Sequence, residues 1–286
     1  MKRIVLFVLI FSLMSGFVFA RRGVDPSFIP IDKESEITSS DEIADRVWKD
    51  PYLGMEFVYV PGGCYEMGCS SWTDRCDDDE YPVHTVCVDE FWIGRYEVTF
   101  EQYDRFCEET GRSKPDDGGW GRGTRPVINV SWYDAKAFAK WLSKKTGYKF
   151  RLPTEAEWEY ACRGGGKKVK YGTSTGGLSH DLANYLGTGG RDRWKYTSPV
   201  GSFPPNPLGL YDMSGNVWEW CEDVYSSNAY EHHSRLNPIY TSGGSYHVGR
   251  GGGWNSDSTL VRCANRNFGS SSSGSFSVGF RLLLKK

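Results

Sequence analysis

The sequence predicts a single α+β domain with little regular secondary structure. Helical periodicity is confined to three segments, and each of them follows a capping box. From residue 163 onward, glycine and serine become frequent and helical patterning ends. Aromatic residues make up 15% of the chain, including 11 Trp, so we expect aromatic packing to hold a loop-rich backbone in place.

Residues 1–20 have the pattern of an export signal. Lys2 and Arg3 form a basic start, an apolar stretch covers 4–14, and Val18-Phe19-Ala20 resembles a cleavage site. The apolar stretch is shorter than the roughly 20 residues that a membrane-spanning helix needs. We therefore expect cleavage, export to the periplasm, the cell surface or the medium, and no stable membrane span. A retained anchor is the alternative.

The next segments predict a linker and the first strands of the domain. Residues 21–50 carry charge and serine without apolar periodicity, which indicates a linker before a domain at 51–286. Alternating and β-branched residues at 55–60 predict a strand that ends in the turn 61–63. A second strand is predicted at 84–88.

Three helix starts are marked by an oxygen-bearing N-cap with a polar partner three residues later. The pairs are Thr99 with Gln102, Ser131 with Asp134, and Thr154 with Glu157. The second helix is expected over 132–144, and Gly147 is expected to end it. Its apolar face consists of Ala135, Phe138, Ala139, Trp141 and Leu142.

Charge and motifs exclude several classes of function. Lys and Arg total 34 against 36 Asp and Glu, so no basic excess indicates a nucleic-acid partner. The chain contains no phosphate-binding loop or dinucleotide fingerprint. The five histidines do not repeat at helical spacing with a carboxylate, which argues against a histidine-rich iron site.

Eight cysteines in an exported chain predict disulfides, although sequence alone leaves the connectivity open. Four of them lie within 24 residues and predict two local bridges: Cys64, Cys69, Cys76 and Cys87. A zinc site is the alternative, but no CxxC spacing supports it.

Four separated segments carry a family resemblance. They are RLPTEAEWEYACRGG at 151–165, GLYDMSGNVWEWCED at 209–223, GRGGGW at 249–254 and GFR at 279–281. Together they resemble the formylglycine-generating enzyme (sulfatase-modifying factor) family over roughly 55–284. The resemblance implies the C-type-lectin-like fold of that family. It also implies a disulfide between Cys162 and Cys263. With that bridge and the two local ones set aside, Cys107 and Cys221 are expected to pair by elimination.

The resemblance further implies calcium, a hard cation that accepts irregular oxygen ligands from loops. The positions that match the first site are Asn184, Tyr185, Asp192 and Trp194. The positions that match the second site are Asp212, Gly215, Val217 and Glu219. The alternative is that Asp212 and Glu219 only cap turns.

Enzymes of this family use two cysteines to bind copper and convert a sulfatase cysteine to formylglycine. Here Ser256 stands where the first of these would fall, and the next cysteine is Cys263, which matches a bridging position. A hydroxyl is a poor ligand for Cu(I), so we expect neither copper nor catalysis. A formylglycine-generating oxidase remains the alternative function, and a purely structural envelope protein is a third.

The segment 255–280 differs in composition from the rest of the chain. It contains no Lys, Glu, Gln, Met or Trp, as expected if adenines of asparagine codons had been randomised. This resembles the variable proteins of diversity-generating retroelements. Ordinary loop composition is the alternative.

We therefore predict an exported, non-catalytic protein that binds an unidentified protein or glycan. Short polar side chains and aromatic anchors suit such a surface. The residues expected to form an exposed binding surface are Trp254, Asn255, Ser256, Asp257, Ser258, Thr259, Leu260, Asn267, Phe268, Ser270, Ser271, Ser272, Ser273, Ser275 and Phe276.

Overall fold

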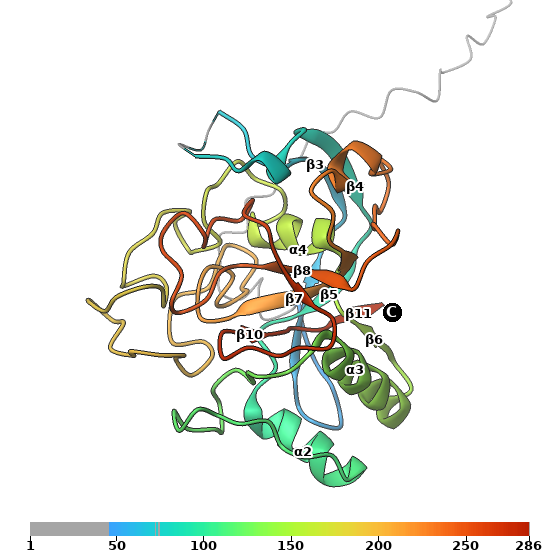
Figure 1. Ribbon diagram of the computed structural model, residues 1–286, viewed down its shortest axis with the longest axis vertical. Helices are drawn as coiled ribbons and strands as arrows, with labels where there is room; N and C mark the ends of the chain where they lie inside the picture. Colours follow the sequence, from blue (N-terminus) through green and yellow to red (C-terminus); the bar gives the residue numbers. More distant parts are fainter. Residues whose placement is uncertain (1–45, 72, 74, 286) are drawn as a thin grey trace, which may run out of the picture. The chain divides into compact units, whose positions relative to one another are not determined.

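A computed structural model describes residues 46–71, 73 and 75–285, and it has the predicted mixture of helices and sheets (Figure 1). The predicted signal at 1–20 and most of the predicted linker lie outside the described residues. The end of that linker is misplaced, because β1 (Val47–Lys49) is part of the domain. It pairs antiparallel with β2 (Glu56–Val60), and the Trp48 ring lies 5.7 Å from that of Phe57.

One sheet of five antiparallel strands has the order β1-β2-β5-β11-β6. The remaining strands are β5 (Phe91–Gly94), β6 (Lys149–Arg151) and β11 (Leu283–Lys285). The last strand of the chain thus lies between β5 and β6. The residues just before it, including the GFR segment, are therefore held in the interior.

A second sheet has the order β10-β7-β8-β9. Its strands are β10 (Val278–Gly279), β7 (Trp218–Val224), β8 (Tyr246–Arg250) and β9 (Asn267–Ser270). β9 and β10 form its two edges, and both belong to the segment of unusual composition.

A separate hairpin pairs β3 (Gly63–Met67) with β4 (His84–Val88). The predicted strand at 84–88 is confirmed, whereas β3 was not predicted. Its sequence, GCYEM, begins with glycine and exposes a glutamate, so it lacks the usual strand signal. Short 3-10 helices, η1 (Asp78–Glu80) and η2 (Ala229–His232), lie elsewhere in the domain.

All three predicted capping boxes are present. They start α2 (Phe100–Thr110), α3 (Trp132–Thr146) and α4 (Glu155–Cys162). The five apolar residues expected on the second helix are all buried in α3. α3 ends at Gly147, whose φ of 80° is a left-handed conformation that glycine adopts without steric cost.

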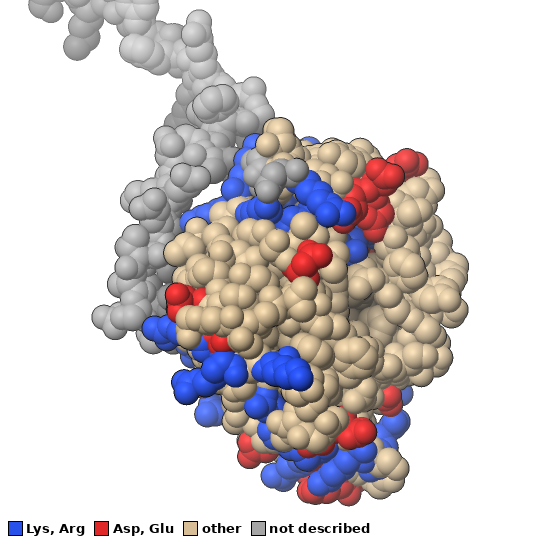
Figure 2. Space-filling model, turned by 60° about the vertical axis from the view of Figure 1, so that its left-hand side comes forward, with Lys and Arg blue, Asp and Glu red and all other residues tan. Residues whose placement is uncertain are grey.

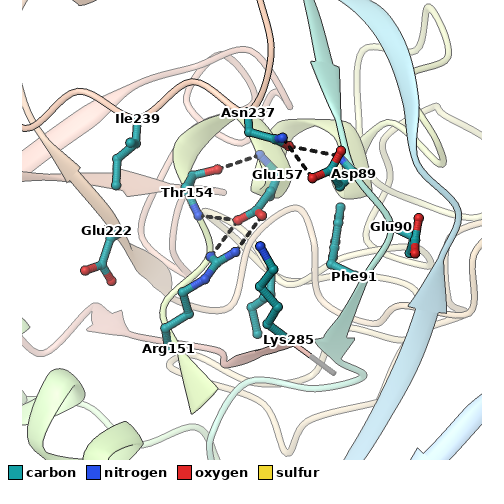
Figure 3. A pocket seen from close by; sticks show the side chains of 11 residues that line it. Asp89, Glu90, Phe91, Arg151, Thr154, Glu157, Glu222, Asn237, Ile239 and Lys285 are labelled. Atoms are coloured by element: carbon teal, nitrogen blue, oxygen red, sulfur yellow. Dashed lines mark hydrogen bonds and ion pairs between the residues drawn. The ribbon is translucent and has the colours of Figure 1, made fainter. Parts of the chain in front are cut away.

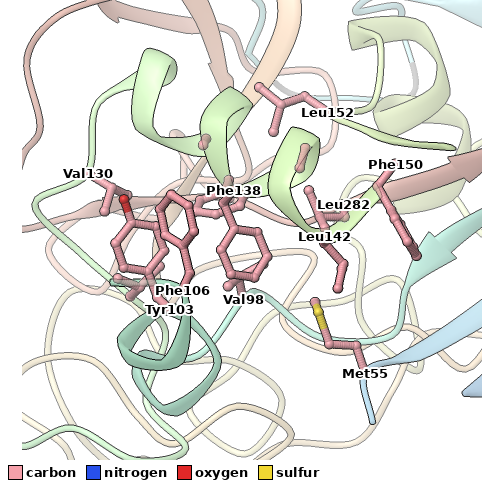
Figure 4. Close-up of a cluster of buried hydrophobic side chains, with 14 of the residues drawn as sticks. Met55, Val98, Tyr103, Phe106, Val130, Phe138, Leu142, Phe150, Leu152 and Leu282 are labelled. Atoms are coloured by element: carbon pink, nitrogen blue, oxygen red, sulfur yellow. The ribbon is translucent and has the colours of Figure 1, made fainter. Parts of the chain in front are cut away.

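Two hydrophobic clusters fill the interior. One lies among α2, α3 and the five-stranded sheet, where the rings of Tyr103 and Phe138 stack at 5.6 Å and Phe106 packs edge-on at 5.5 Å (Figure 4). The other joins α4, the β3–β4 hairpin and the second sheet around Trp158. Aromatic packing therefore holds the helices, as the composition predicted.

Three disulfides link the described cysteines. The pairing of Cys162 with Cys263 is confirmed, as are two local bridges among the four clustered cysteines. The local pairs are Cys64–Cys87 and Cys69–Cys76, so these sulfurs do not form a zinc site.

The expected pairing of Cys107 with Cys221 is wrong. Both thiols are free and buried, Cys107 in the α2–α3 cluster and Cys221 in the α4 cluster. Pairing by elimination fails because the two cysteines belong to different hydrophobic clusters, so the fold does not bring their sulfur atoms together. In the described part of the chain, no helix has the length and apolar character needed to cross a membrane.

Candidate functional site: a C-terminal surface on a buried arginine framework

The C-terminal segment, taken as residues 249–281, places most of its predicted binding residues at the surface. Phe268 and Phe276 are each 49% exposed, which is unusual for phenylalanine. Trp254, Thr259, Ser270 and Ser275 are half-buried. The other exposed members of the predicted set are Asn255, Asp257, Ser258, Leu260, Asn267, Ser272 and Ser273.

Two predicted surface residues, Ser256 and Ser271, are instead buried. The Ser256 hydroxyl accepts the Gly253 N–H at 3.0 Å and so closes a tight turn. The Ser271 hydroxyl donates to the Ser245 carbonyl and accepts from His247 Nδ1 at 2.9 Å. Both hydroxyls satisfy buried polar groups, which explains why they face inward.

A cluster of four aromatic rings lies at one end of this surface. Trp254 and Phe276 come from the C-terminal segment, and their ring centroids are 6.0 Å apart. Trp120 and Tyr196 come from distant loops and stack on each other at 4.3 Å. Trp254 packs edge-on against both, at 5.3 and 5.1 Å. No local pattern in the sequence marks Trp120 and Tyr196, because only the fold brings their loops to the segment.

A second aromatic group lies at the opposite edge of the four-stranded sheet. Phe268 of β9 stacks on Tyr225 at 4.2 Å and meets Tyr246 of β8 edge-on at 5.5 Å. A small hollow between the two edges is lined by Trp218, Trp220, Gly249, Asn267, Phe268, Gly269 and Val278. A side chain at Gly269 would come within 2.5 Å of the Trp220 ring, so the hollow depends on this glycine.

Beneath the surface, four arginines from the same segment are buried and bound to carboxylates. Each pairs with a carboxylate from outside the segment: Arg250 with Glu159, Arg262 with Glu80, Arg266 with Glu155, and Arg281 with Glu219. The last three pairs are bidentate, with N–O distances of 2.6–3.0 Å. Such geometry fixes orientation as well as distance.

Two side chains of the first predicted calcium site, Asn184 and Asp192, are buried. Asn184 donates through Nδ2 to the Tyr196 carbonyl at 2.8 Å, but its Oδ1 is buried without a hydrogen-bond partner. Asp192 accepts from the Trp194 N–H at 3.2 Å and lies 3.3 Å from His180 Nδ1. Burial raises the pKa of Asp192. The unpartnered Asn184 Oδ1 and the buried Asp192 carboxylate are both hard oxygen donors of the kind that Ca²⁺ accepts.

The second predicted calcium site lies against the first. A Cβ at Gly215 would come within 2.1 Å of the Asn184 carbonyl, so only glycine allows this approach. Burial raises the pKa of Asp212 to about 6, although its carboxylate accepts the Gly201 N–H at 2.8 Å. Val217 is buried, and its N–H points to Glu97 at 3.3 Å.

Two carboxylates in this region have different partners from those expected. Both oxygens of Glu219 are already occupied, by Arg281 and by the Trp158 indole N–H at 2.8 Å. Glu97, which the sequence did not single out, is buried and accepts from Asn216 at 2.6 Å. Burial and the charges of Asp212 and Glu219 raise its pKa well above the usual value. Both oxygens of Glu97 are occupied as well, by the Asn216 amide and the Val217 N–H.

The residues at the position of the family's copper site do not fit copper. Ser256 offers a hydroxyl that is already bonded, and Cys263 is bridged to Cys162. The free thiols among the described residues, Cys107 and Cys221, are both buried in the hydrophobic clusters. Cu(I) prefers accessible soft thiolate ligands, and none of these residues supplies one here.

A further pocket lies away from the C-terminal surface, between β5, β6 and the start of α4 (Figure 3). Its central charges neutralise each other, because Arg151 binds both oxygens of Glu157 at 2.7 Å. Glu157 also accepts the Thr154 N–H at 2.8 Å as part of the helix cap. The pocket therefore serves the α4 capping structure and contains no activated nucleophile.

Comparisons with known proteins agree with this architecture. Residues 45–286 match the family described as sulfatase-modifying factor enzyme 1-like domain. A serine/threonine-protein kinase, pkn1, of Chlamydia caviae is 34% identical over 265 residues, which cover 84% of this chain and 40% of the kinase. The chain thus spans only about two fifths of that relative. The formylglycine-generating enzyme of Thermomonospora curvata is 31% identical, over 78% of this chain and 91% of the enzyme.

Two solved structures are similar over most of the described domain. PvdO from Pseudomonas aeruginosa superimposes with a TM-score of 0.74 and 32% identity, covering 84% of this chain and 98% of PvdO. Treponema denticola variable protein 1 gives a TM-score of 0.64 and 25% identity, with the same coverage of 84% and 98%. The sequence match and the shared fold show that this chain belongs to the family of sulfatase-modifying factor enzyme 1-like domains.

Proposed function

We propose that this protein is an exported, non-catalytic binding protein that recognises a macromolecular ligand through its C-terminal segment. The single observation that carries the proposal is the division of that segment. Its arginines are buried and paired, while its phenylalanines at 268 and 276 and most of its short polar residues lie at least partly at the surface. Exposed aromatic anchors surrounded by adaptable Ser and Asn side chains are typical of binding surfaces.

The charge distribution supports the same proposal. Figure 2 brings forward the loops on the left of Figure 1, and the face it shows has a wide area with few charged side chains. The centre of a protein-binding surface is usually depleted of charge and enriched in aromatic residues. Trp120 and Tyr196 supply such residues from outside the segment, so part of the anchor does not depend on the segment's own sequence.

The alternative, a formylglycine-generating oxidase, has less support. The resemblance to the Thermomonospora curvata enzyme favours it, but Ser256 and Cys263 do not provide a copper-binding thiol pair. Three disulfides are typical of proteins that fold in an oxidising compartment, which supports export.

We also propose that the segment 255–280 is diversified by a retroelement. Its restricted composition and the similarity to a solved variable protein support this proposal. Sequencing the gene's neighbourhood tests it. An adenine-rich near-copy of the segment beside a reverse transcriptase gene is expected, and a locus with neither would contradict diversification.

Two calcium ions complete the proposed scaffold. Asn184 and Asp192 would hold one, while Asp212, with Glu97 and Glu219 close by, would hold the other. Bound calcium would balance buried negative charge and fix the loops that carry Tyr196. It would therefore organise the surface and take no part in chemistry.

The binding proposal is tested by screening the protein on glycan and extracellular-protein arrays beside the double variant Trp254→Ala/Phe276→Ala. Loss of an aromatic anchor typically costs about 2 kcal/mol, or roughly 30-fold in Kd. The matched control is Lys167→Ala/Lys168→Ala, because these exposed side chains lie outside the segment. This variant should bind the ligand as the native protein does. Conversion of a CxPxR peptide to formylglycine by the native protein would instead establish the oxidase.

A further inference from the structure

A second surface, formed by α3 and β6, is rich in lysines. It is separate from the proposed ligand-binding surface. A groove between the two elements is lined by the basic residues Lys136, Lys140, Lys149 and Arg151. Lys144 lies one helical turn beyond Lys140 on the same face of α3. The chain as a whole has a net charge of −2, so this basic surface is a local feature.

The basic side chains of this surface fall into two groups. Those at the inner end are neutralised, since Lys136 pairs with Glu222 and Arg151 pairs with Glu157. Those at the outer end, Lys140, Lys144 and Lys149, are exposed and have no ion pair with any described residue. Uncompensated positive charge is therefore concentrated at the turn that joins α3 to β6.

The arrangement of these lysines is unfavourable in the isolated protein. Lys140 and Lys144 are four residues apart, which places like charges on neighbouring helical turns. Lys149 lies directly opposite Lys285 of β11 in the antiparallel register. Like charges opposite each other destabilise a sheet, and a polyanionic surface would relieve that repulsion.

An aromatic residue lies among these lysines. Tyr148 is 38% exposed, and its ring packs edge-on against Trp48 with centroids 4.9 Å apart. A tyrosine ring with one buried face and a polar tip, flanked by lysines with long apolar stems, matches the boundary between lipid headgroups and acyl chains. This combination favours a lipid surface over a soluble polyanion.

We propose that the outer α3–β6 surface, comprising Lys140, Lys144, Tyr148 and Lys149, docks the protein onto an anionic phospholipid membrane. In Figure 1, α3 and β6 lie on the right of the domain, and the red loop after β8 extends to the left. Docking through the lysines therefore directs that loop away from the lipid. The membrane would hold the protein while the C-terminal surface stays accessible to its ligand.

The test is co-sedimentation of the full chain with lipid vesicles. Vesicles with about one third phosphatidylglycerol are compared with neutral phosphatidylcholine vesicles, because lysines near an anionic surface contribute about 1 kcal/mol each, or roughly fivefold in partitioning. The variant Lys140→Gln/Lys144→Gln/Lys149→Gln should lose about 100-fold in partitioning to the anionic vesicles. Raising the salt to about 0.5 M should abolish most of the native protein's binding.

Two matched variants make the result specific. Lys167→Gln/Lys168→Gln/Arg191→Gln removes three exposed charges elsewhere and should bind like the native chain. Lys140→Arg/Lys144→Arg/Lys149→Arg keeps the charges and should also bind. Equal losses in both Gln variants, or equal binding to neutral vesicles, would overturn the proposal. Binding to soluble polyphosphate without vesicle binding would also overturn it, by assigning the lysines to a free phosphate ligand.

Discussion

Arginines and serines are interspersed along roughly the last forty residues, but the arginines are buried whereas several of the serines are exposed. Arg250, Arg262 and Arg281 have no exposed surface and bind carboxylates that lie 62–182 positions away in the sequence. Ser258, Ser272 and Ser273 between them are exposed. The arginines of this stretch are buried, which reverses the usual pattern, while most of its serines lie partly or fully at the surface.

The difference teaches how a segment can vary and still fold. A buried bidentate pair depends on one geometry, and removing one partner leaves an uncompensated charge in the interior. An exposed serine depends on little beyond its own backbone. Stability and recognition can therefore be carried by neighbouring residues of one short stretch without competing.

The largest effect is expected from breaking a framework pair. Arg281→Met leaves Glu219 without its two guanidinium bonds, at a cost of about 3–5 kcal/mol in the free energy of unfolding. Arg191→Met, at an exposed arginine, should change the free energy of unfolding by less than about 0.5 kcal/mol. Denaturant unfolding measures both. Similar stabilities of the two variants would show that the buried arginines are not a framework.

The next effect concerns the disulfide that anchors the segment to α4. Cys162 and Cys263 are 101 positions apart, for which chain entropy gives up to about 4.7 kcal/mol. Cys69 and Cys76 are 7 apart, for which the same model gives about 2.4 kcal/mol. Replacing each pair by alanine and measuring unfolding should therefore cost more for the long bridge. A larger loss for the short bridge would contradict a role of the long one in holding the segment.

Removal of calcium tests whether the loops beside the C-terminal surface stabilise the fold, as the buried arginine pairs do. At a free concentration 100 times Kd, one site adds about 2.7 kcal/mol to the native state, so chelation should lower the melting temperature. Asn184→Leu should remove part of this calcium-dependent increment, because it deletes the unpartnered Oδ1. Identical melting curves with chelator and with excess calcium, together with no calcium in elemental analysis, would argue against both sites.

The smallest effects separate the serines from one another. Ser256→Ala removes the acceptor of a buried N–H and should cost about 1–3 kcal/mol. Ser271→Ala should cost a similar amount for the same reason. Ser258→Ala and Ser272→Ala, at exposed positions, should stay within about 0.5 kcal/mol. Thermal melting of the four variants checks this order, and four equal melting temperatures would remove the distinction.

Local signals in the sequence predicted much of the scaffold. The capping boxes at Thr99, Ser131 and Thr154 are confirmed because a cap depends on groups only three residues apart. The strand at 84–88 is confirmed for a similar reason, since its β-branched residues favour extended backbone wherever they lie. The long-range disulfide came from the family resemblance, which carries tertiary information that local patterns lack.

Composition alone determined that residues 255–280 differ from the rest of the chain, and the family motifs on either side of them predicted the fold. Only the tertiary structure decided which of its serines face inward and that Trp120 and Tyr196 join its aromatic cluster. It also decided that Cys107 and Cys221 stay apart and that Glu97 lies buried beside Asn216 and Val217. The physical reason is common to all four. Burial and contact depend on segments remote in sequence meeting in space, and no spacing along the chain encodes that meeting.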